Sequence, residues 1–80
     1  MSKATLVHQH LLDTSGLFCP EPIMLVHNKL NEMNSGELLL LIATDPATKR
    51  DVPKLCQFLK HTLIQQEEDQ QQYRYWLQKA

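Results

Sequence analysis

The stretch DTSGLFCPEP, residues 13–22, decides the fold of this chain. Gly16 can adopt backbone angles that other residues avoid, so it can turn the chain sharply after an extended segment. Pro20 and Pro22 fit the first turn of a helix, where the N–H that proline lacks has no partner within the helix. The stretch therefore predicts the end of a strand, a tight turn and the start of a helix.

The segments on either side agree with this prediction. Residues 5–12 are expected to form a strand. From residue 20 onward the apolar residues recur at spacings of three and four, which is typical of a helix with one buried face. Gly36 is expected to end this helix. Its apolar face is formed by Ile23, Val26, Leu30 and Met33.

The second half of the chain predicts a strand, a helix and two more strands. Residues 37–43 include the run LLLLI, which fits a central strand that is buried on both faces or lies beside other strands, although periodicity alone also allows a helix. A second helix is expected to start near Asp51, because Pro53 should be tolerated only in a first turn and Asp51 can cap it. Residues 61–67 and 72–78 are predicted strands, and the short polar connection between them favours an antiparallel hairpin.

The element order is thus β-α-β-α-β-β, with both helices on one face of the sheet and the first three strands parallel. Open α/β sheets place their sites at the edge where the strands end. We therefore expect Cys19 to share a rim with the entry to the second helix. This places Asp45, Lys49 and Arg50 within reach of a sulfur anion or an acidic partner. Ordinary exposed charge is the alternative interpretation of Lys49 and Arg50.

Cys19 is the candidate reactive residue. It falls at the expected N-cap of the first helix, where unpaired N–H groups and the helix dipole favour a negative charge. Pro20 and Pro22 carry no N–H, so the amides of Cys19 and Glu21 are expected to face the sulfur and favour a thiolate. The Glu21 carboxylate opposes this effect. Gly16, Pro20, Glu21 and Pro22 are thus the supporting residues of the predicted site. The alternative interpretation is that Cys19 is a small residue buried before a proline.

Size and composition exclude several classes of protein. A chain of 80 residues with 42% apolar content suits one domain, residues 1–80, and has no room for a second core. A net charge of −1 provides no basic face for nucleic acid. No apolar run is long enough to span a bilayer and no signal-peptide pattern opens the chain, so we expect a cytoplasmic protein without membrane contact.

No motif predicts a metal site or a bound cofactor. His8 and His10 can share one face of a strand, but they lack a third ligand, so solvent-facing side chains are the favoured interpretation. The sequence has no recognisable Ser/His/Asp arrangement or glycine-rich phosphate loop, which argues against a self-contained hydrolase. Cys56 is expected on the apolar face of the second helix, with a role in the core.

Four motifs carry a family resemblance: LDxxGLxCPxP at residues 12–22, GE at 36–37, DPATxRDVP at 45–53 and YRY at 73–75. Together they resemble the TusA/SirA-like family of CPxP sulfur carriers over nearly the whole chain. The resemblance implies an α+β fold, a two-layer α/β sandwich with a mixed four-stranded sheet. In that family the last strand is antiparallel to the others.

The same resemblance implies that Cys19 carries sulfur as a persulfide and that the chain is a sulfurtransferase acting with partner enzymes. The implied donor is a pyridoxal-phosphate cysteine desulfurase. The implied acceptor is a DsrE-like relay complex that leads to 2-thiouridine at the tRNA wobble position, so tRNA is not itself a ligand of this chain. Other family members serve molybdenum-cofactor or sulfur-oxidation pathways, and the motifs do not separate these uses.

Two hypotheses of other classes compete with sulfur transfer. In the first, the chain is a non-catalytic binding or regulatory module that uses the Cys19 edge as a docking surface. In the second, Cys19 and Cys56 form a redox disulfide. The lack of C-x-x-C spacing and the core position expected for Cys56 disfavour the redox hypothesis.

Overall fold

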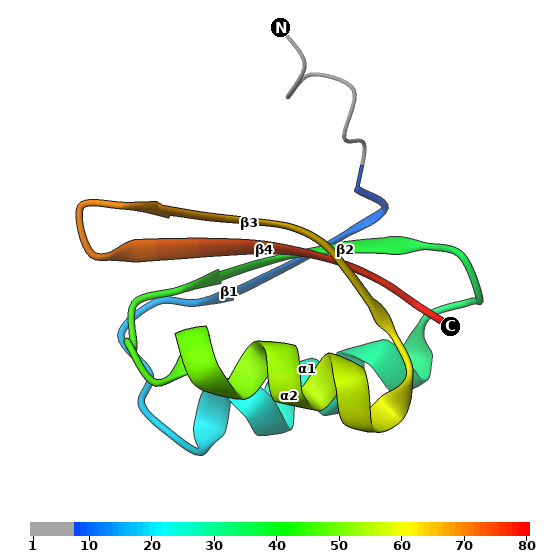
Figure 1. The fold of residues 1–80 in the computed structure, drawn as a ribbon, viewed down its shortest axis with the longest axis horizontal. Helices are drawn as coiled ribbons and strands as arrows, with labels where there is room; N and C mark the ends of the chain where they lie inside the picture. Colours follow the sequence, from blue (N-terminus) through cyan, green and yellow to red (C-terminus); the bar gives the residue numbers. More distant parts are fainter. Residues whose placement is uncertain (1–7) are drawn as a thin grey trace, which may run out of the picture.

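The structure of the protein is a computed structural model, and it describes residues 8–80. Strands and helices alternate and then give way to a hairpin, as the sequence predicts (Figure 1). The elements are β1 (His10–Thr14), α1 (Glu21–Glu32), β2 (Leu38–Ala43), α2 (Thr48–Leu59), β3 (Thr62–Asp69) and β4 (Gln72–Gln78). The first strand ends two residues later than expected, and its expected start at residues 5–7 lies outside the described residues.

The four strands form one mixed sheet in the order β1-β2-β4-β3. β1 and β2 are parallel, whereas β4 is antiparallel to both of its neighbours, β2 and β3. Both helices lie against one face of this sheet, which makes a two-layer sandwich (Figure 1). The expected fold class is therefore confirmed, including a last strand that is antiparallel to the other three.

The core lies between the helices and the sheet. On β2 and β4 every second side chain points toward the helices, which is the period of a strand. The opposite wall comes from the apolar faces of α1 and α2. The buried apolar residues are Val26, Leu30, Met33, Leu39, Leu41, Ala43, Val52, Cys56, Tyr73, Tyr75 and Leu77. Removal of this apolar surface from water is the main source of stability for a domain of this size.

β2 is a central strand between β1 and β4, the second of the two settings that its apolar run allows. It is central in the sheet, but only one of its faces is buried, and the other face, with Leu38, Leu40 and Ile42, is half-buried. Within residues 8–80 both helices pack on the same side, so no helix covers that second face. The continuous apolar run therefore indicates that the strand is central in the sheet. It does not indicate that both faces of the strand are covered.

The starts of both helices also differ from their predictions. α1 begins at Glu21 with Pro20 as its N-cap, so Cys19 lies one residue before the cap. α2 begins at Thr48 and not near Asp51, and Pro53 lies inside it. Proline at that position removes one helical hydrogen bond. The helix continues because buried residues on both sides of the proline, Val52 and Cys56, hold it on the sheet.

The β3–β4 hairpin has a tighter tip than predicted. The two strands extend to Asp69 and Gln72, and only Gln70 and Gln71 connect them. Both connecting residues have positive φ, 48° and 66°, as two-residue hairpin turns that match the strand twist require. The tip lies at the same end of the molecule as the starts of the two helices (Figure 1).

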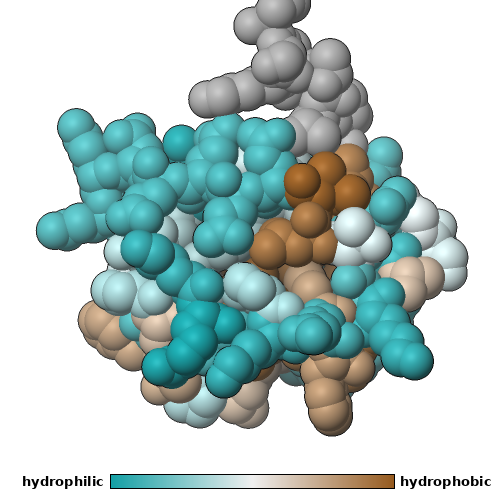
Figure 2. Space-filling view, in the orientation of Figure 1, coloured by the Kyte–Doolittle hydropathy of each residue, from teal (hydrophilic) through white to brown (hydrophobic). Residues whose placement is uncertain are grey.

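The surface is largely hydrophilic on the side that Figure 2 presents, and its most hydrophobic patch lies beside the grey segment. Several large apolar side chains of the described residues are nevertheless exposed, among them Phe18, Met24 and Phe58. None of the helices in residues 8–80 is both long and apolar enough to cross a membrane.

Candidate functional site

Cys19 is an exposed, free thiol in the loop between β1 and α1. The loop is folded by short-range bonds: the Leu17 amide donates to the Thr14 carbonyl at 3.1 Å, and the Glu21 amide donates to the Phe18 carbonyl at 2.9 Å. Gly16 has a φ of +83°, the left-handed conformation that glycine tolerates best. The predicted turn at Gly16 thus delivers the thiol to the surface at the start of α1.

The Asp45 carboxylate fixes the backbone of Cys19. Asp45 Oδ2 accepts the Cys19 N–H at 2.6 Å, and Oδ1 accepts the Ala47 N–H at 3.0 Å. The side chain is buried, so these bonds satisfy a charge that would otherwise be costly to bury. One carboxylate therefore joins the thiol loop to the first turn of α2.

The Thr48 hydroxyl also holds the junction between the thiol loop and α2 in place. The Thr48 hydroxyl donates to the Asp45 carbonyl at 2.7 Å and lies 2.9 Å from the Tyr75 hydroxyl. Burial raises the pKa of Tyr75, which keeps the phenol neutral and able to hydrogen-bond. The start of α2 is thus anchored to β4 in the centre of the sheet.

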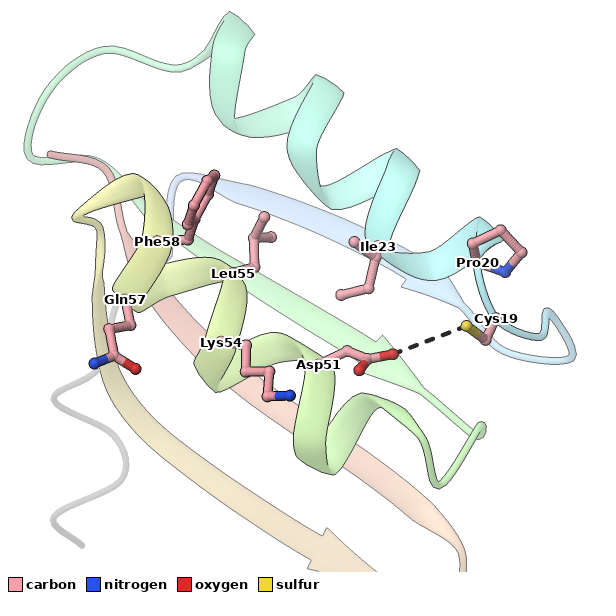
Figure 3. Close-up of a pocket in the computed structure, with 8 residues that line it drawn as sticks. All are labelled: Cys19, Pro20, Ile23, Asp51, Lys54, Leu55, Gln57 and Phe58. Carbon is pink, nitrogen blue, oxygen red and sulfur yellow. Dashed lines mark hydrogen bonds between the residues drawn. The ribbon is translucent and has the colours of Figure 1, made fainter.

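Asp51 faces the sulfur from the first turn of α2. The Cys19 Sγ donates to Asp51 Oδ2 at 3.9 Å, as the dashed line in Figure 3 marks. Asp51 Oδ1 accepts the Arg50 Nε–H at 3.1 Å. The Asp51 side chain is only 21% exposed, so Arg50 on one side and the sulfur on the other restrict its orientation.

A groove of about 720 Å³ runs from Cys19 between the two helices, and we call it the Cys19 groove. Figure 3 shows Ile23 of α1 opposite Leu55 and Phe58 of α2, with the thiol at one end. Phe58 lies toward the other end and is 83% exposed. The lining residues are Cys19, Pro20, Ile23, Asp51, Lys54, Leu55, Gln57 and Phe58. An accessible thiol beside an apolar groove suits transfer chemistry with a docked partner protein.

Comparison with protein-family models matches residues 10–79 to the family described as "Sulfurtransferase TusA". The chain belongs to the TusA family. Sulfur carrier proteins TusA of Pseudomonas paraeruginosa and Pseudomonas aeruginosa are each 52% identical to it over 69 residues, which cover 86% of this chain and 87% of theirs. The sulfur carrier protein TusA of Pseudomonas entomophila is 49% identical over 74 residues, 92% of either chain.

A solved structure supports the fold independently. The crystal structure of a SirA-like protein from Desulfitobacterium hafniense matches with a TM-score of 0.77 and covers 88% of this chain and 96% of its own. Its sequence identity is 15%, so this likeness concerns the fold alone. The expected family and the expected fold are thus both confirmed.

The structure of this TusA-family chain differs from expectation at the two amides beside the thiol. The Cys19 N–H is bonded to Asp45, and the Glu21 N–H is bonded to Phe18. Both donors are therefore engaged away from the sulfur. Of the supporting residues, Pro20 lines the groove beside the thiol, whereas Pro22 is a buried residue of the first turn of α1.

Lys49 and Arg50, the predicted rim cations, face different surroundings. Lys49 pairs with Glu68 at 3.1 Å and lies 5.8 Å from the centre of the Tyr73 ring, and the bond to Glu68 raises the pKa of Lys49. Lys49 is thus held against the hairpin and does not line the Cys19 groove. Arg50 reaches the sulfur only through Asp51.

Cys56 is a core residue. It is 3% exposed on the inner face of α2, and burial raises its pKa to about 11. Cys19 and Cys56 are both free cysteines. This placement agrees with the core role that the sequence predicts for Cys56 and disfavours a redox disulfide.

The histidine pair takes different roles from those of a metal site. His10 Nε2 lies 2.8 Å from Glu37 Oε1, and His8 precedes β1. Across residues 8–80 no three His, Cys, Asp or Glu side chains form a group that could hold a metal ion.

Six groove residues were missed as site residues from the sequence: Asp51 as a contact of the sulfur, and Ile23, Lys54, Leu55, Gln57 and Phe58 as lining. A signal for four of them exists. Residues 51, 54, 55 and 58 follow the spacing of one helical face, next to the buried face that contains Val52 and Cys56. What the sequence lacked was the position of that second face relative to Cys19.

Proposed function

We propose that the protein carries sulfur as a persulfide on Cys19 and transfers it between two partner proteins. The observation that supports this most strongly is the exposed Cys19 thiol at the end of the groove, with its backbone fixed by Asp45. The other cysteine is buried in the core, so Cys19 is the thiol that a partner can reach. Membership of the TusA family supports sulfur transfer as the general chemistry.

The loading step needs no oxidant and no cofactor on this chain. The Cys19 sulfur attacks the outer sulfur of a persulfide on the donor. The S–S bond of the donor breaks, the donor cysteine leaves as a thiolate, and a new S–S bond forms on Cys19. The sulfane sulfur keeps its oxidation state. A thiol that loads and unloads in this way must be accessible from solvent, as Cys19 is.

The donor we propose is a cysteine desulfurase, a pyridoxal-phosphate enzyme that forms a persulfide from free cysteine. The Cys19 groove supports docking of such a protein, because its apolar lining and the exposed Phe58 ring can be covered by a partner surface. The same docking brings the donor persulfide to the thiol end of the groove.

The acceptor we propose is a DsrE-like relay that leads to 2-thiouridine in tRNA, which would place the protein in the cytoplasm. A net charge of −1 supports an indirect role, because direct tRNA binding calls for a basic face. Delivery to a molybdenum-cofactor or sulfur-oxidation pathway would use the same Cys19 chemistry with another acceptor.

Intact mass spectrometry tests the proposal. The protein is incubated with a cysteine desulfurase and cysteine, and the mass gain is compared between the wild type, Cys19→Ser and Cys56→Ser. We expect one added sulfur atom on the wild type and on Cys56→Ser, and none on Cys19→Ser. If Cys19→Ser still supports tRNA thiolation in cells, the Cys19 edge acts as a docking surface only and the proposal fails.

A further inference from the structure

The carboxylates of Glu21, Asp45 and Asp51 belong to the loops and helix starts that meet at Cys19, and they differ in what they contact. Both oxygens of Asp45 accept backbone N–H groups. Glu21 is exposed in the first turn of α1. Asp51 alone among the described side chains accepts a hydrogen bond from the Cys19 sulfur. The contact is 3.9 Å long, within reach of a weak S–H donor, and such contacts often tighten only when substrate is bound.

The position of Asp51 suits a group that exchanges a proton. It lies in the first turn of α2, on the side of that helix that meets the thiol loop. The Arg50 guanidinium holds Oδ1, which leaves Oδ2 directed at the sulfur (Figure 3). The side chain also lines the groove, so a partner docked there reduces its contact with water.

We propose that Asp51 is the proton acceptor for the Cys19 thiol during sulfur loading; this inference rests on the proposed function. As the Cys19 sulfur attacks the outer sulfur of the donor persulfide, its proton moves to Asp51 Oδ2. The donor S–S bond breaks, and the donor cysteine leaves as a thiolate. Asp51 then releases the proton to that thiolate or to water, so charge and atoms balance.

The same carboxylate serves the unloading step. A thiolate of the acceptor attacks the outer sulfur of the Cys19 persulfide, and the S–S bond on Cys19 breaks. Asp51, which is deprotonated after loading, first takes up a proton from the solvent, and Oδ2 then passes that proton to the Cys19 thiolate. Asp51 therefore acts as base in one direction and as acid in the other.

The negative charge of Asp51 could also slow loading, and this opposite prediction makes the inference testable. A carboxylate beside a sulfur also repels a thiolate, so a purely electrostatic role predicts faster loading when the charge is removed. The charged and titratable groups shown near Asp51 are Cys19 from the β1–α1 loop, whose amide is bonded to Asp45 of the β2–α2 loop, and Arg50 and Lys54 from α2 itself. If Asp51 accepts the thiol proton, removal of its carboxylate should instead make loading slower.

The test measures sulfur loading from a small persulfide, such as cysteine persulfide, against pH. Asp51→Asn keeps the shape of the side chain and an oxygen for Arg50, but it cannot accept the proton. We expect loading at neutral pH to fall by about 100-fold, and the deficit to narrow as the pH rises, because hydroxide then removes the proton in both proteins. Asp51→Glu should recover part of the rate.

Glu32→Gln is the matched control, because it removes one negative charge at the far end of α1 from Cys19. Its loading profile should equal that of the wild type, and thermal unfolding should show that all variants are folded. The inference is overturned if Asp51→Asn loads as fast as the wild type, loads faster, or shows a deficit that does not change with pH. If the wild type itself takes up no sulfur on Cys19, the proposed function fails and this inference fails with it.

Discussion

The Asp45 carboxylate and the Cys19 amide, 26 residues apart in sequence, meet in a hydrogen bond of 2.6 Å. This bond holds the thiol loop to the start of α2. Removal of the carboxylate should therefore affect both the stability of the fold and the position of the thiol.

Asp45→Ala leaves the part-buried amides of Cys19 and Ala47 without their acceptor. Each such loss costs about 1–3 kcal/mol, so we expect the free energy of unfolding to fall by about 3 kcal/mol in total. Urea unfolding measures this change. Asp69→Ala, which removes an exposed acid at the hairpin, should change the stability by less than about 0.5 kcal/mol. Equal effects of the two variants would contradict the role given to Asp45.

The exposed ring of Phe58 should matter for partner proteins and not for folding. Because the side chain is 83% exposed, Phe58→Ala should change the free energy of unfolding by less than about 0.5 kcal/mol. Loading by a protein donor should need about tenfold more donor for the same rate, whereas loading by a small persulfide should be unchanged. Leu11→Ala removes another exposed apolar side chain, on β1, and serves as the control. A Phe58 variant that behaves like the Leu11 variant with the protein donor would show that the groove does not dock it.

Cys56 should take no part in sulfur transfer but should contribute to the stability of the core. Cys56→Ser buries a hydroxyl group in an apolar environment, so we expect a loss of about 2 kcal/mol in the free energy of unfolding. Sulfur loading of the folded variant should equal that of the wild type. Burial and a pKa of about 11 also predict that iodoacetamide modifies Cys19 in the native protein and reaches Cys56 only after unfolding. Modification of Cys56 in the native state would contradict its placement in the core.

Glu37 should contribute to stability in a pH-dependent way. The Asn34 N–H and the His10 side chain lower the pKa of Glu37 below its ordinary value of 4.5. A carboxylate with a lowered pKa stabilises the fold above its ordinary value, and this contribution is lost as the pH falls through the folded pKa. Glu37→Gln should therefore be less stable than the wild type near pH 6. The difference should shrink progressively as the pH falls below 4.5, which thermal unfolding at several pH values can follow. A difference that stays constant with pH would assign the effect to packing and not to charge.

The elements that the sequence predicted well are those whose signal is local. β4 has the predicted bounds, because Tyr73, Tyr75 and Leu77 alternate with polar or outward-facing residues. The turn at Gly16 and the apolar face of α1 depend likewise on neighbours in sequence. The order of elements then limited the fold to one helical layer on a mixed sheet, and the family motifs agreed with it.

The features that escaped prediction depend on contacts between distant residues. α2 starts at Thr48 because the Thr48 hydroxyl bonds the Asp45 carbonyl and meets Tyr75, 27 residues away. The local sequence predicts Asp51 only as a cap of the second helix, because its partner, the Cys19 sulfur, lies 32 residues away in the chain. The amides expected to face the sulfur are likewise taken by other acceptors. Each of these contacts is fixed by how the two loops meet at the sheet edge, which no local pattern records.

The central claim is that the Cys19 sulfur carries the transferred sulfur atom, and an isotope label tests it most directly. The protein is loaded by a desulfurase with ³⁵S-labelled cysteine, digested without reductant, and its peptides are analysed for the label. The account predicts the label on the peptide that contains Cys19, with release by a thiol reductant or on transfer to an acceptor protein. Label that is absent from that peptide, or that resides on Cys56, would contradict it.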